Sequence, residues 1–540
     1  MTLRKLVSIL VATLALFGID AQSAYACKRV VVRQGDDLVK VFSGPRTKYV
    51  IKDNIDLKGK KVKIGERCTL LFQGGCLSNG TIEGTDTKIN DTHNNIFKNC
   101  RIGGMWKVKC ASSLMFDNNL DAGVLLRNLA CLSPHLKLHA NRTYYINENE
   151  IELDVETIEA ASTEKPLLRF HTSNPDKEGL KIFGKNIVLR NIKFMDDYDE
   201  KNDAKYGTNK HTIGNMIAVR SRDKSVSSLT VEGCDFSGGT SSSYVASSQT
   251  KNCLVKDCSF SGYIGDHAVY CSMVVENFVV KDCLVKNVVH TRGLFKIRSS
   301  DNAKVFTIQN LNVRNLNGYL ANVSLLATSN CELLFDRIKV SKDNRDTSVF
   351  YGFCINDETK SISGKGYNAN CIMINNCEFE YGYNGNPVVY HGAGQMVRVK
   401  AIRYINTHTI NSNFAGGYTD CLLVDRCVFD ECCGKKGMAL YAKHVTINHS
   451  KITVKNGAMA NCLFLINYNQ ELLENITMTN LIIDANVANM INVVKDGRVN
   501  VSITNCKITS VRQSVIKATT NGAIVLREKN NDKNVEMILK

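Results

Sequence analysis

Short stretches in which apolar and polar residues alternate recur along most of the chain. Each has two apolar positions separated by a variable one, then Asn, Asp or Gly, then Cys or another apolar residue, and then a second apolar stretch, as in LTVEGCDF and VSITNCKI. Alternation with a period of two is typical of a β-strand with one buried face, and Asn, Asp and Gly favour turns. Each copy therefore predicts two short strands that meet at a polar corner.

The copies recur at a nearly constant interval, typically about 23–28 residues, which is typical of a solenoid that stacks one unit on the next. The 50-residue interval from Cys377 to Cys427 predicts two coils, and the 39-residue interval from Ile338 to Cys377 predicts one coil with an inserted loop. The residue that follows the corner is, in successive copies, Ile192, Cys234, Cys258, Cys283, Leu311, Ile338, Cys377, Cys427, Ser450, Leu481 and Cys506.

This pattern resembles the right-handed parallel β-helix of the pectin-lyase-like superfamily, which includes pectate lyases, chondroitinase B and phage tailspikes. The resemblance covers roughly residues 160–527 and implies an all-β solenoid. Leucine-rich repeats have a similar period, but their L-x-x-L-x-L spine does not recur here. Because many cysteines share one position of the coil, we expect them to stack inward as small apolar side chains.

The first residues are typical of an export signal. Arg4 and Lys5 precede an apolar run from Leu6 to Ile19, and Ala24-Tyr25-Ala26 fits a cleavage site. The run is shorter than the roughly 20 residues that span a membrane. The sequence therefore predicts a secreted or exported bacterial protein, in the periplasm or at the cell surface, without a transmembrane segment. Cys27 follows the predicted cut, where a bacterial lipoprotein carries its lipid, so a lipid anchor at Cys27 stays open.

A region of different character lies between the signal and the repeats. Strand and Gly-turn patterns fill residues 28–105, and NLDAGVLLRNLACL at 119–132 is apolar at helical spacing. We expect this helix to cap the open end of the solenoid. The expected divisions are the signal peptide at 1–26, the strand-rich region with its helical cap at 27–158, the parallel β-helix at 159–527 and a charged tail at 528–540.

Composition and charge narrow the possible functions only in part. The 540 residues include 68 Lys and Arg against 52 Asp and Glu, with five Pro, one Trp and 21 Cys. This cationic excess suits an acidic partner, and the scarcity of Pro excludes collagen-like and mucin-like classes. The cysteines are too sparse for a compact disulfide scaffold, and no paired CxxC spacing predicts a zinc site. No phosphate loop, dinucleotide fingerprint or nucleophile elbow occurs, and nucleic acid is not an expected partner.

Sliding the coils over one another aligns a second set of strands, which we expect to carry outward side chains. The aligned segments are MIAVRSR, SYVASS, HAVYCSM, LFKIRSS, ANVSLLA, FYGFCIN and VVYHGAG. They combine cations, a phenol and imidazoles without paired carboxylates. The candidate catalytic residues are Lys296, Arg298, Tyr270 and His267. The candidate substrate-binding residues are Arg220, Arg222, Arg292, His290 and His391.

This mixture fits β-elimination from an acidic, uronic-acid-containing polysaccharide. That reaction removes the C5 proton of a sugar after its carboxylate has been neutralised, and Lys, Arg, Tyr and His can fill these parts. The arginines are expected to grip carboxylates or sulfates of adjacent sugars in bidentate fashion. Two alternatives stay open: a glycoside hydrolase of the same fold using Asp266, Asp357 and Glu358, and a non-catalytic glycan-binding adhesin. Lys296 and Arg298 could also form only a solvated face.

The segment GLFKIRSSDN loosely resembles part of the chondroitinase B and alginate lyase family, in which a catalytic Lys precedes Ser and Asn on such a strand. Here Arg298 stands at the place of that Lys, and Leu294 and Lys296 replace the acidic residues that bind calcium in the family. The resemblance therefore implies a reaction class rather than membership, and it leaves Ca²⁺ as the one cofactor to consider. His391 in YHGAG resembles the Gly-His-Gly element of polygalacturonases, but the paired Asp residues of that family are not found nearby, which disfavours an inverting hydrolase.

Overall fold

The computed structural model divides into two compact units, each described separately below. Unit 1 comprises Met1–Lys109, Leu114–Leu120 and Cys131–Ser133, and unit 2 comprises the remainder of the chain. The predicted export signal lies outside the described residues. The structure describes residues 27–539 except 91–93, 172–175, 198–212, 223–225, 241, 301–302, 327–328, 358–366, 383–386, 392–396, 415–417, 434–436, 455–460, 468–472, 495–498, 519–523, 530 and 533–536.

Unit 1 contains the strand-rich region that the sequence predicts. Its strands pair in parallel in the order β1-β2-β5-β6-β3, with β4 and β7 also paired to β6. Trp106, the single Trp of the sequence, has a structural role here, because its indole packs where a Cβ on Gly84 would stand and its Nε1 donates to the Gly103 carbonyl at 2.8 Å. The elements are β1 (Lys28–Val32), α2 (Leu38–Phe42), β2 (Thr47–Ile51), β3 (Asn54–Asp56), β4 (Lys61–Lys63), β5 (Thr69–Phe72), β6 (Cys76–Asn90) and β7 (Phe97–Trp106).

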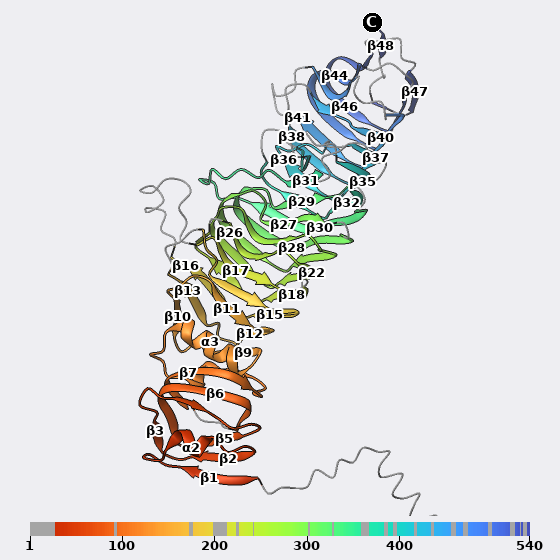
Figure 1. The fold of residues 1–540 in the computed structure, drawn as a ribbon. Helices are drawn as coiled ribbons and strands as arrows, with labels where there is room; N and C mark the ends of the chain where they lie inside the picture. The colour runs from red at the N-terminus through yellow and green to blue at the C-terminus, as the bar shows by residue number, and fades with distance from the viewer. Residues whose placement is uncertain are drawn as a thin grey trace, which may run out of the picture. The chain divides into compact units, whose positions relative to one another are not determined.

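Unit 2 is a parallel β-helix in which the chain passes through the same strand positions once per coil. Figure 1 shows its strands following one another in sequence order along the stack, from β9 to β48. One face is a nine-stranded parallel sheet with the order β11-β14-β17-β21-β24-β27-β29-β31-β34. These strands are β11 (Ile151–Asp154), β14 (Leu180–Phe183), β17 (Asn215–Arg220), β21 (Ser243–Ser247), β24 (His267–Ser272), β27 (Phe295–Ser300), β29 (Ala321–Leu325), β31 (Phe353–Asp357) and β34 (Val389–His391).

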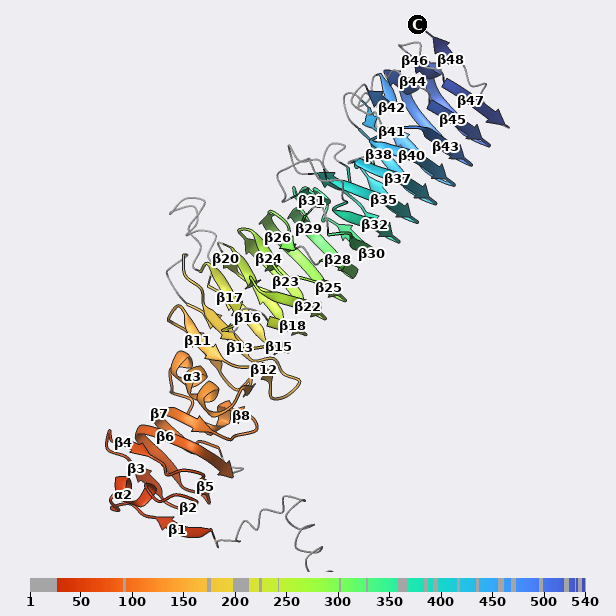
Figure 2. The same cartoon turned by 45° about the vertical axis from the view of Figure 1, so that its right-hand side comes forward.

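The other faces of unit 2 are formed by a 32-stranded sheet that turns around the corners. Figure 2 shows β15, β18, β22 and β25 on one side of the stack and β11, β17, β24 and β29 on another. The short helix η1 (Ser113–Met115) begins with Ser113 of unit 2 and continues in unit 1, and the last two residues of α3 (Ala122–Leu132) also belong to unit 1. In the first half the strands are β8 (Ala111–Ser112), β9 (His135–Leu138), β10 (Thr143–Ile146), β12 (Thr157–Ala160), β13 (Leu167–Phe170), β15 (Asn186–Arg190), β16 (Lys193–Asp196), β18 (Val226–Glu232), β19 (Asp235–Ser237), β20 (Gly239–Thr240), β22 (Thr250–Lys256), β23 (Ser259–Ile264), β25 (Asn277–Lys281), β26 (Leu284–Thr291) and β28 (Val305–Gly318). In the second half come β30 (Cys331–Ser341), β32 (Ala369–Asn375), β33 (Glu378–Phe379), β35 (Arg398–Ile405), β36 (His408–Ile410), β37 (Tyr418–Asp425), β38 (Val428–Cys432), β39 (Met438–Ala439), β40 (Ala442–Asn448), β41 (Lys451–Val454), β42 (Cys462–Asn467), β43 (Asn475–Thr479), β44 (Ile482–Val494), β45 (Val499–Thr504), β46 (Lys507–Ala518), β47 (Ile524–Lys529) and β48 (Met537–Leu539).

Strand pairing in unit 2 extends beyond the range in which the repeat is visible in the sequence. It begins with β8 and β9, before residue 159, and α3 forms within the segment predicted as a helix. At the other end β47 pairs with β45 and β48 pairs with β46, so the segment expected to be a charged tail carries strands of the last coil. Charged residues are compatible with these strands because only one side of each strand faces the core.

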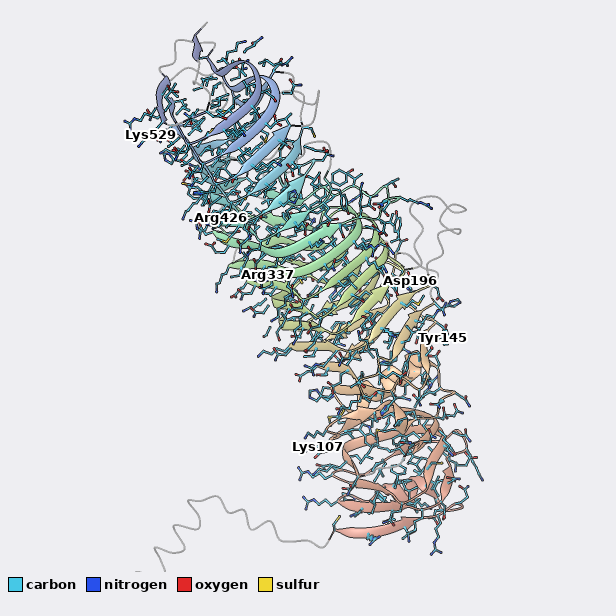
Figure 3. The ribbon with its side chains drawn as sticks, turned by 180° about the vertical axis from the view of Figure 1, so that it is seen from behind. Lys107, Tyr145, Asp196, Arg337, Arg426 and Lys529 are labelled. Atoms are coloured by element: carbon cyan, nitrogen blue, oxygen red, sulfur yellow. The ribbon has the colours of Figure 1, made fainter. Side chains whose placement is uncertain are left out.

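The polar corner of each repeat turns through a left-handed backbone conformation. Asn and Gly adopt positive φ with the least strain, which explains their frequency at this position. Neighbouring corners also bond to each other, as Asn406 donates to Asn376 at 2.8 Å and Asn505 donates to Asn480 at 3.1 Å. Figure 3 places two corner residues, Arg337 and Arg426, along one edge of unit 2. The corner residues have φ between 47° and 63° and are Asn191, Gly233, Asp257, Asp282, Asn310, Arg337, Asn376, Asn406, Arg426, His449, Asn480 and Asn505.

The residue after each corner forms the predicted inward ladder. The ladder cysteines are buried and free, and each thiol donates to the carbonyl two residues before it, as in Cys283 to Lys281 at 3.1 Å. Thr407 and Ser450 occupy the same position and bond in the same way. The position is buried and takes either a small side chain with one donor or an aliphatic one, as at Leu311 and Ile338. Burial raises the pKa of Cys234, Cys377 and Cys427 to about 12, which keeps these thiols protonated and unreactive.

The strand pairing also explains the two irregular intervals of the repeat, which are 50 and 39 residues long. Between Cys377 and Cys427 an extra coil passes through Thr407, and β35 pairs with β32 on one side and with β37 on the other. Between Ile338 and Cys377 no coil intervenes, because β30 pairs directly with β32. Both predictions from the spacing are confirmed.

Candidate functional site

The nine-stranded sheet contains all seven segments that the sequence analysis aligned. The register runs without interruption from Ile217 through Val245, Val269, Phe295 and Ala321. Residues in this row are buried, as expected for the inward side of each strand. The alignment made by sliding the coils is therefore confirmed, and it fixes which side chains share the outward face.

Two outward rows run across the middle strands of this sheet. They lie on either side of an inward row formed by Cys271, Ile297 and Val323, all fully buried. The first outward row is Tyr270, Lys296, Asn322 and Cys354. The second outward row is Ser272, Arg298, Ser324 and Asn356.

Tyr270, Lys296 and Arg298 form the centre of the candidate site, and we call them the cation–phenol cluster. Lys296 follows Tyr270 in the first row, with its Nζ 6.0 Å from the centroid of the Tyr270 ring. Both side chains are half-buried, while Arg298 is exposed in the second row. Because neighbouring strands are about 4.8 Å apart, a ligand along this face would reach all three side chains together.

His267 lies at the start of β24 and is almost fully buried. Its ring centroid is 5.4 Å from that of Tyr270, and its Nδ1 is 2.6 Å from the carbonyl oxygen of Gly293. Burial first, and then the positive charge of Lys296, lower the pKa of His267 to about 3. The imidazole is therefore neutral, and because a carbonyl only accepts, Nδ1 carries the proton that it donates to Gly293.

Gly293 provides this carbonyl through a conformation that other residues rarely adopt. Its φ is +141°, and a Cβ at this position would lie 2.4 Å from the Cβ of Asn322. Asn322 in turn donates from Nδ2 to the carbonyl of Arg292 at 3.0 Å and accepts from Nδ2 of Asn356 at 2.9 Å. Backbone and amide groups thus hold the chain beside the cation–phenol cluster in place.

Arg292 lies at the rim of the cluster, in the turn before β27. Its guanidinium is 3.4 Å from a carboxylate oxygen of Asp266, and its backbone NH bonds to the Asp266 carbonyl at 3.2 Å. The Arg292 side chain is 75% exposed, so this ion pair leaves most of the guanidinium in contact with solvent. Asp266, one of the carboxylates considered for hydrolysis, is thus engaged by a cation.

The structure does not bring Arg220 and Arg222 to the cluster. Arg220 lies on β17, three coils or about 14 Å before β27, and its guanidinium is 2.5 Å from Glu178. Arg222 bonds to both carboxylate oxygens of Asp154, at 2.8 and 3.0 Å, and lies over the ring of Phe183. Both arginines are therefore paired with acids of this chain, and the spacing of residues in the sequence does not predict these two ion pairs.

The two remaining histidines are placed by their backbone only, because their side chains lie outside the described residues. His290 is in β26, a strand of the 32-stranded sheet. His391 is in β34, where its backbone pairs with that of Ile355. Asp357 ends β31, with its side chain undescribed, and Glu358 lies outside the described residues.

Sequence reasoning missed three residues that border the cluster. Asn322 follows Lys296 in the first row, and the same alternation that selected Lys296 would have selected it. Tyr319 and Tyr351 each lie two residues before the first strand residue of their coil, with ring centroids 5.2 Å apart. The sequence gives little indication of these two tyrosines, because residues in the turn before a strand do not follow the alternation of apolar and polar positions.

The cluster does not fit a Ca²⁺ ion. Calcium takes six to eight oxygen ligands, and this face presents an ammonium and a guanidinium instead. Across the described part of the chain, no group of three or more His, Cys, Asp or Glu side chains is arranged to hold a metal. In the same residues no helix has the length and apolar character needed to cross a membrane.

Comparison with known proteins does not assign the chain to a family. No protein-family pattern matches the chain, and no curated protein matches it. Among solved structures, the chain is similar to the catalytic unit of a thermostable GH87 α-1,3-glucanase from Streptomyces thermodiastaticus strain HF3-3, at 8% sequence identity and a TM-score of 0.17. The match covers 92% of this chain and 65% of the glucanase chain. A likeness at this level carries no argument about function, and the assignment of the fold depends on the strands and their register.

Proposed function

We propose that unit 2 binds an acidic polysaccharide along its nine-stranded sheet and cleaves it by β-elimination at the cation–phenol cluster. The observation that carries this proposal is the composition of the outward face on three successive strands. These positions supply two cations, one phenol and neutral polar groups, a set that suits a carboxylate-bearing substrate. At the outward positions on β24, β27 and β29, the side chains of Tyr270, Lys296, Asn322 and Arg298 are half-buried or exposed, whereas Ser272 and Ser324 are buried between them.

The reaction needs a neutralised carboxylate and one group that moves a proton. Arg298, with its planar fork of donors, and Lys296 would bind the uronate carboxylate and stabilise the negative charge that develops when the C5 proton leaves. The phenolic oxygen of Tyr270 would take that proton. The C5–H electrons then form the C4–C5 double bond, the C4–O glycosidic bond breaks, and the leaving oxygen receives a proton from the Tyr270 hydroxyl.

His267 supports this site as a positioning residue. A base whose pKa is about 3 is too weak to remove a carbon-bound proton efficiently near neutral pH. Its Nδ1–H instead ties β24 to the Gly293 carbonyl of the next coil, and its ring packs against Tyr270. The imidazole thereby fixes the orientation of the phenol relative to Lys296.

The proposal extends to the setting of the protein. Its fold and its corner motif suit a member of the pectin-lyase-like superfamily that is exported and acts on polysaccharide outside the cytoplasm. Cys27 is exposed at the start of the described chain, with its thiol 3.3 Å from the Arg46 carbonyl, and is accessible for a lipid anchor. Mass spectrometry of the protein from its membrane fraction would distinguish a lipidated Cys27 from a free one.

The test is a survey of pectate, alginate and glycosaminoglycans, read by ultraviolet absorbance of the unsaturated product and by new reducing ends. A lyase gives both signals, a hydrolase such as one using Asp266 gives reducing ends alone, and an adhesin gives binding without either. Lys296→Ala and Arg298→Gln should each abolish the absorbance signal. Lys256→Ala is the matched control, because Lys256 is also half-buried on a strand of unit 2 but lies on the 32-stranded sheet. Full activity in Lys296→Ala would refute the site.

A further inference from the structure

We propose that Tyr319 and Tyr351 form an aromatic platform on which one sugar of the polysaccharide stacks, on the side of the cation–phenol cluster toward the C-terminal coils. This inference rests on the proposed function and adds a binding subsite to it. The two rings have centroids 5.2 Å apart with a 37° tilt between their planes, and both side chains are half-buried. They therefore present a continuous aromatic surface without being withdrawn into the core.

The platform adjoins the first outward row of the sheet. His267 precedes Tyr270 by three residues, and these two rings are in contact with centroids 5.4 Å apart. Tyr319 precedes Asn322 by the same three residues, and Tyr351 holds the same offset before Cys354, on strands in register with β24 and β27. The equal offset places the tyrosines beside the row that continues Tyr270 and Lys296, with Tyr319 about two coils or 10 Å and Tyr351 about three coils or 14 Å from His267.

The backbone holds the platform in place before any ligand binds. The Tyr319 carbonyl accepts from the Leu294 NH at 3.0 Å, and the Tyr351 NH donates to the Gly318 carbonyl at 3.0 Å. Between them the Leu320 NH donates to the Gly352 carbonyl, also at 3.0 Å. A preorganised surface loses less conformational entropy on binding, which favours its use as a recognition element.

The chemistry of a uronic acid unit matches this arrangement. A pyranose ring presents C–H groups on one face, which suit an aromatic surface, while its carboxylate suits Lys296, Arg298 and the exposed Arg292. Trp106, the usual type of residue for such stacking, lies in unit 1 and packs on its own Gly84. The tyrosine pair thus supplies the aromatic surface that the nine-stranded sheet offers next to the cations.

Among the described residues, the two strands on the other side of the cluster carry small side chains in the first row. In the first row these strands contribute Ala218 and Ala246, both buried, and Arg220, on the same strand as Ala218, is paired with Glu178. Neither alanine can stack with a sugar ring. The platform therefore adds binding on the side of the cluster toward the C-terminal coils, which gives the site a direction along the coils.

The experiment measures binding of pectate, alginate and chondroitin sulfate oligosaccharides by calorimetry in a Tyr270→Phe background, which keeps the ring but prevents turnover. Tyr319→Ala with Tyr351→Ala should raise Kd about tenfold, which corresponds to about 1.4 kcal/mol. Tyr319→Phe with Tyr351→Phe should stay within about twofold of the parent, because the stacking surface is retained. In otherwise wild-type protein the alanine pair should raise KM more than it lowers kcat.

The matched control is Tyr418→Ala with Tyr441→Ala. These rings have centroids 5.1 Å apart and are also half-buried, but Tyr418 lies on β37 of the 32-stranded sheet. This control should leave Kd unchanged. If the alanine pair at Tyr319 and Tyr351 binds as tightly as the parent, or the phenylalanine pair as weakly as the alanine pair, the platform is refuted while the catalytic site stands. If the Tyr270→Phe parent binds none of the three polysaccharides, the proposed function fails and the platform with it.

Discussion

Replacing His267 by Asn should remove a pH-dependent part of the stability of unit 2. The imidazole is 6% exposed, and burial together with Lys296 lowers its pKa to about 3, against about 6.5 in an unfolded chain. A group whose pKa is lower in the folded state stabilises the fold fully above its unfolded pKa. This contribution is lost as the pH falls from about 6.5 toward 3, because the unfolded chain binds the proton first.

The magnitude follows from the two pKa values. At pH 5 the imidazole is protonated in the unfolded chain and neutral in the folded protein. Because pH 5 lies about 1.5 units below the unfolded pKa of about 6.5, and each unit corresponds to about 1.36 kcal/mol, the free energy of unfolding falls by about 2 kcal/mol. Asn is neutral at both pH values and can still donate from its amide to the Gly293 carbonyl, which His267 contacts at 2.6 Å. The advantage of wild type over His267→Asn should therefore shrink by about 2 kcal/mol between pH 8 and pH 5.

The assay is urea unfolding of wild type and His267→Asn at pH 8 and pH 5, followed by circular dichroism. His135→Asn serves as the control, because it removes an imidazole that is 46% exposed from β9 of the same unit. A stability difference between wild type and His267→Asn that is equal at both pH values would refute the reasoning. It would mean that folding does not lower the pKa of His267, and its assignment as a neutral positioning residue at pH 5 would have to be withdrawn.

Three further predictions address the fold and the site. In native protein a thiol reagent at pH 8 should label the exposed cysteines rapidly and the buried ladder cysteines only after denaturation, when all 21 react. Rapid labelling of Cys234 in the native protein would contradict its raised pKa. Asn480→Ala should destabilise unit 2 by about 1–2 kcal/mol in urea unfolding because of its φ of 54°, and Asn480→Gly should cost less; equal losses would mean that the amide bonds, not the backbone, dominate. Arg222→Gln should lower the melting temperature slightly without changing the affinity for acidic oligosaccharides, whereas Arg298→Gln should lower that affinity. An affinity loss in Arg222→Gln would show that its pairing with Asp154 opens for substrate. The exposed cysteines are Cys27, Cys131 and Cys421.

Much of the fold could be predicted from the sequence because each coil repeats the same local pattern, a corner residue with positive φ followed by a buried residue. Corner residues such as Asn480 and Asn505 tolerate positive φ, and the next position is buried and holds a cysteine, a small polar or an aliphatic side chain, as at Leu481 and Cys506. Both requirements act within a few residues, so they appear as a motif at fixed spacing. The ends of the solenoid were harder to predict, because β9 and β48 pair with the stack without carrying the corner motif.

The candidate site could be predicted only in part, for a related reason. Lys296 and Tyr270 were found because residues one coil apart in register become neighbours once the strands are aligned. The pairing of Arg222 with Asp154, 68 residues earlier, follows no spacing rule and depends on the direction of both side chains. The turn before each strand, where Tyr319 and Tyr351 lie, is outside the alternation that guided the selection.

The sequence by itself determined the period, the corners, the inward ladder and the row of strands that carries the cation–phenol cluster, since each depends on local backbone preference and on alternation along a strand. The tertiary structure alone decided which arginines at outward positions are partly buried in an ion pair and which are exposed. Arg220 and Arg298 are both arginines at the outward side of aligned strands, yet Glu178 neutralises the first while the second stays exposed beside Lys296. Likewise, only the packing of β24 against the Gly293 turn made His267 a buried, neutral imidazole, because desolvation depends on what surrounds a group in space rather than on its neighbours along the chain.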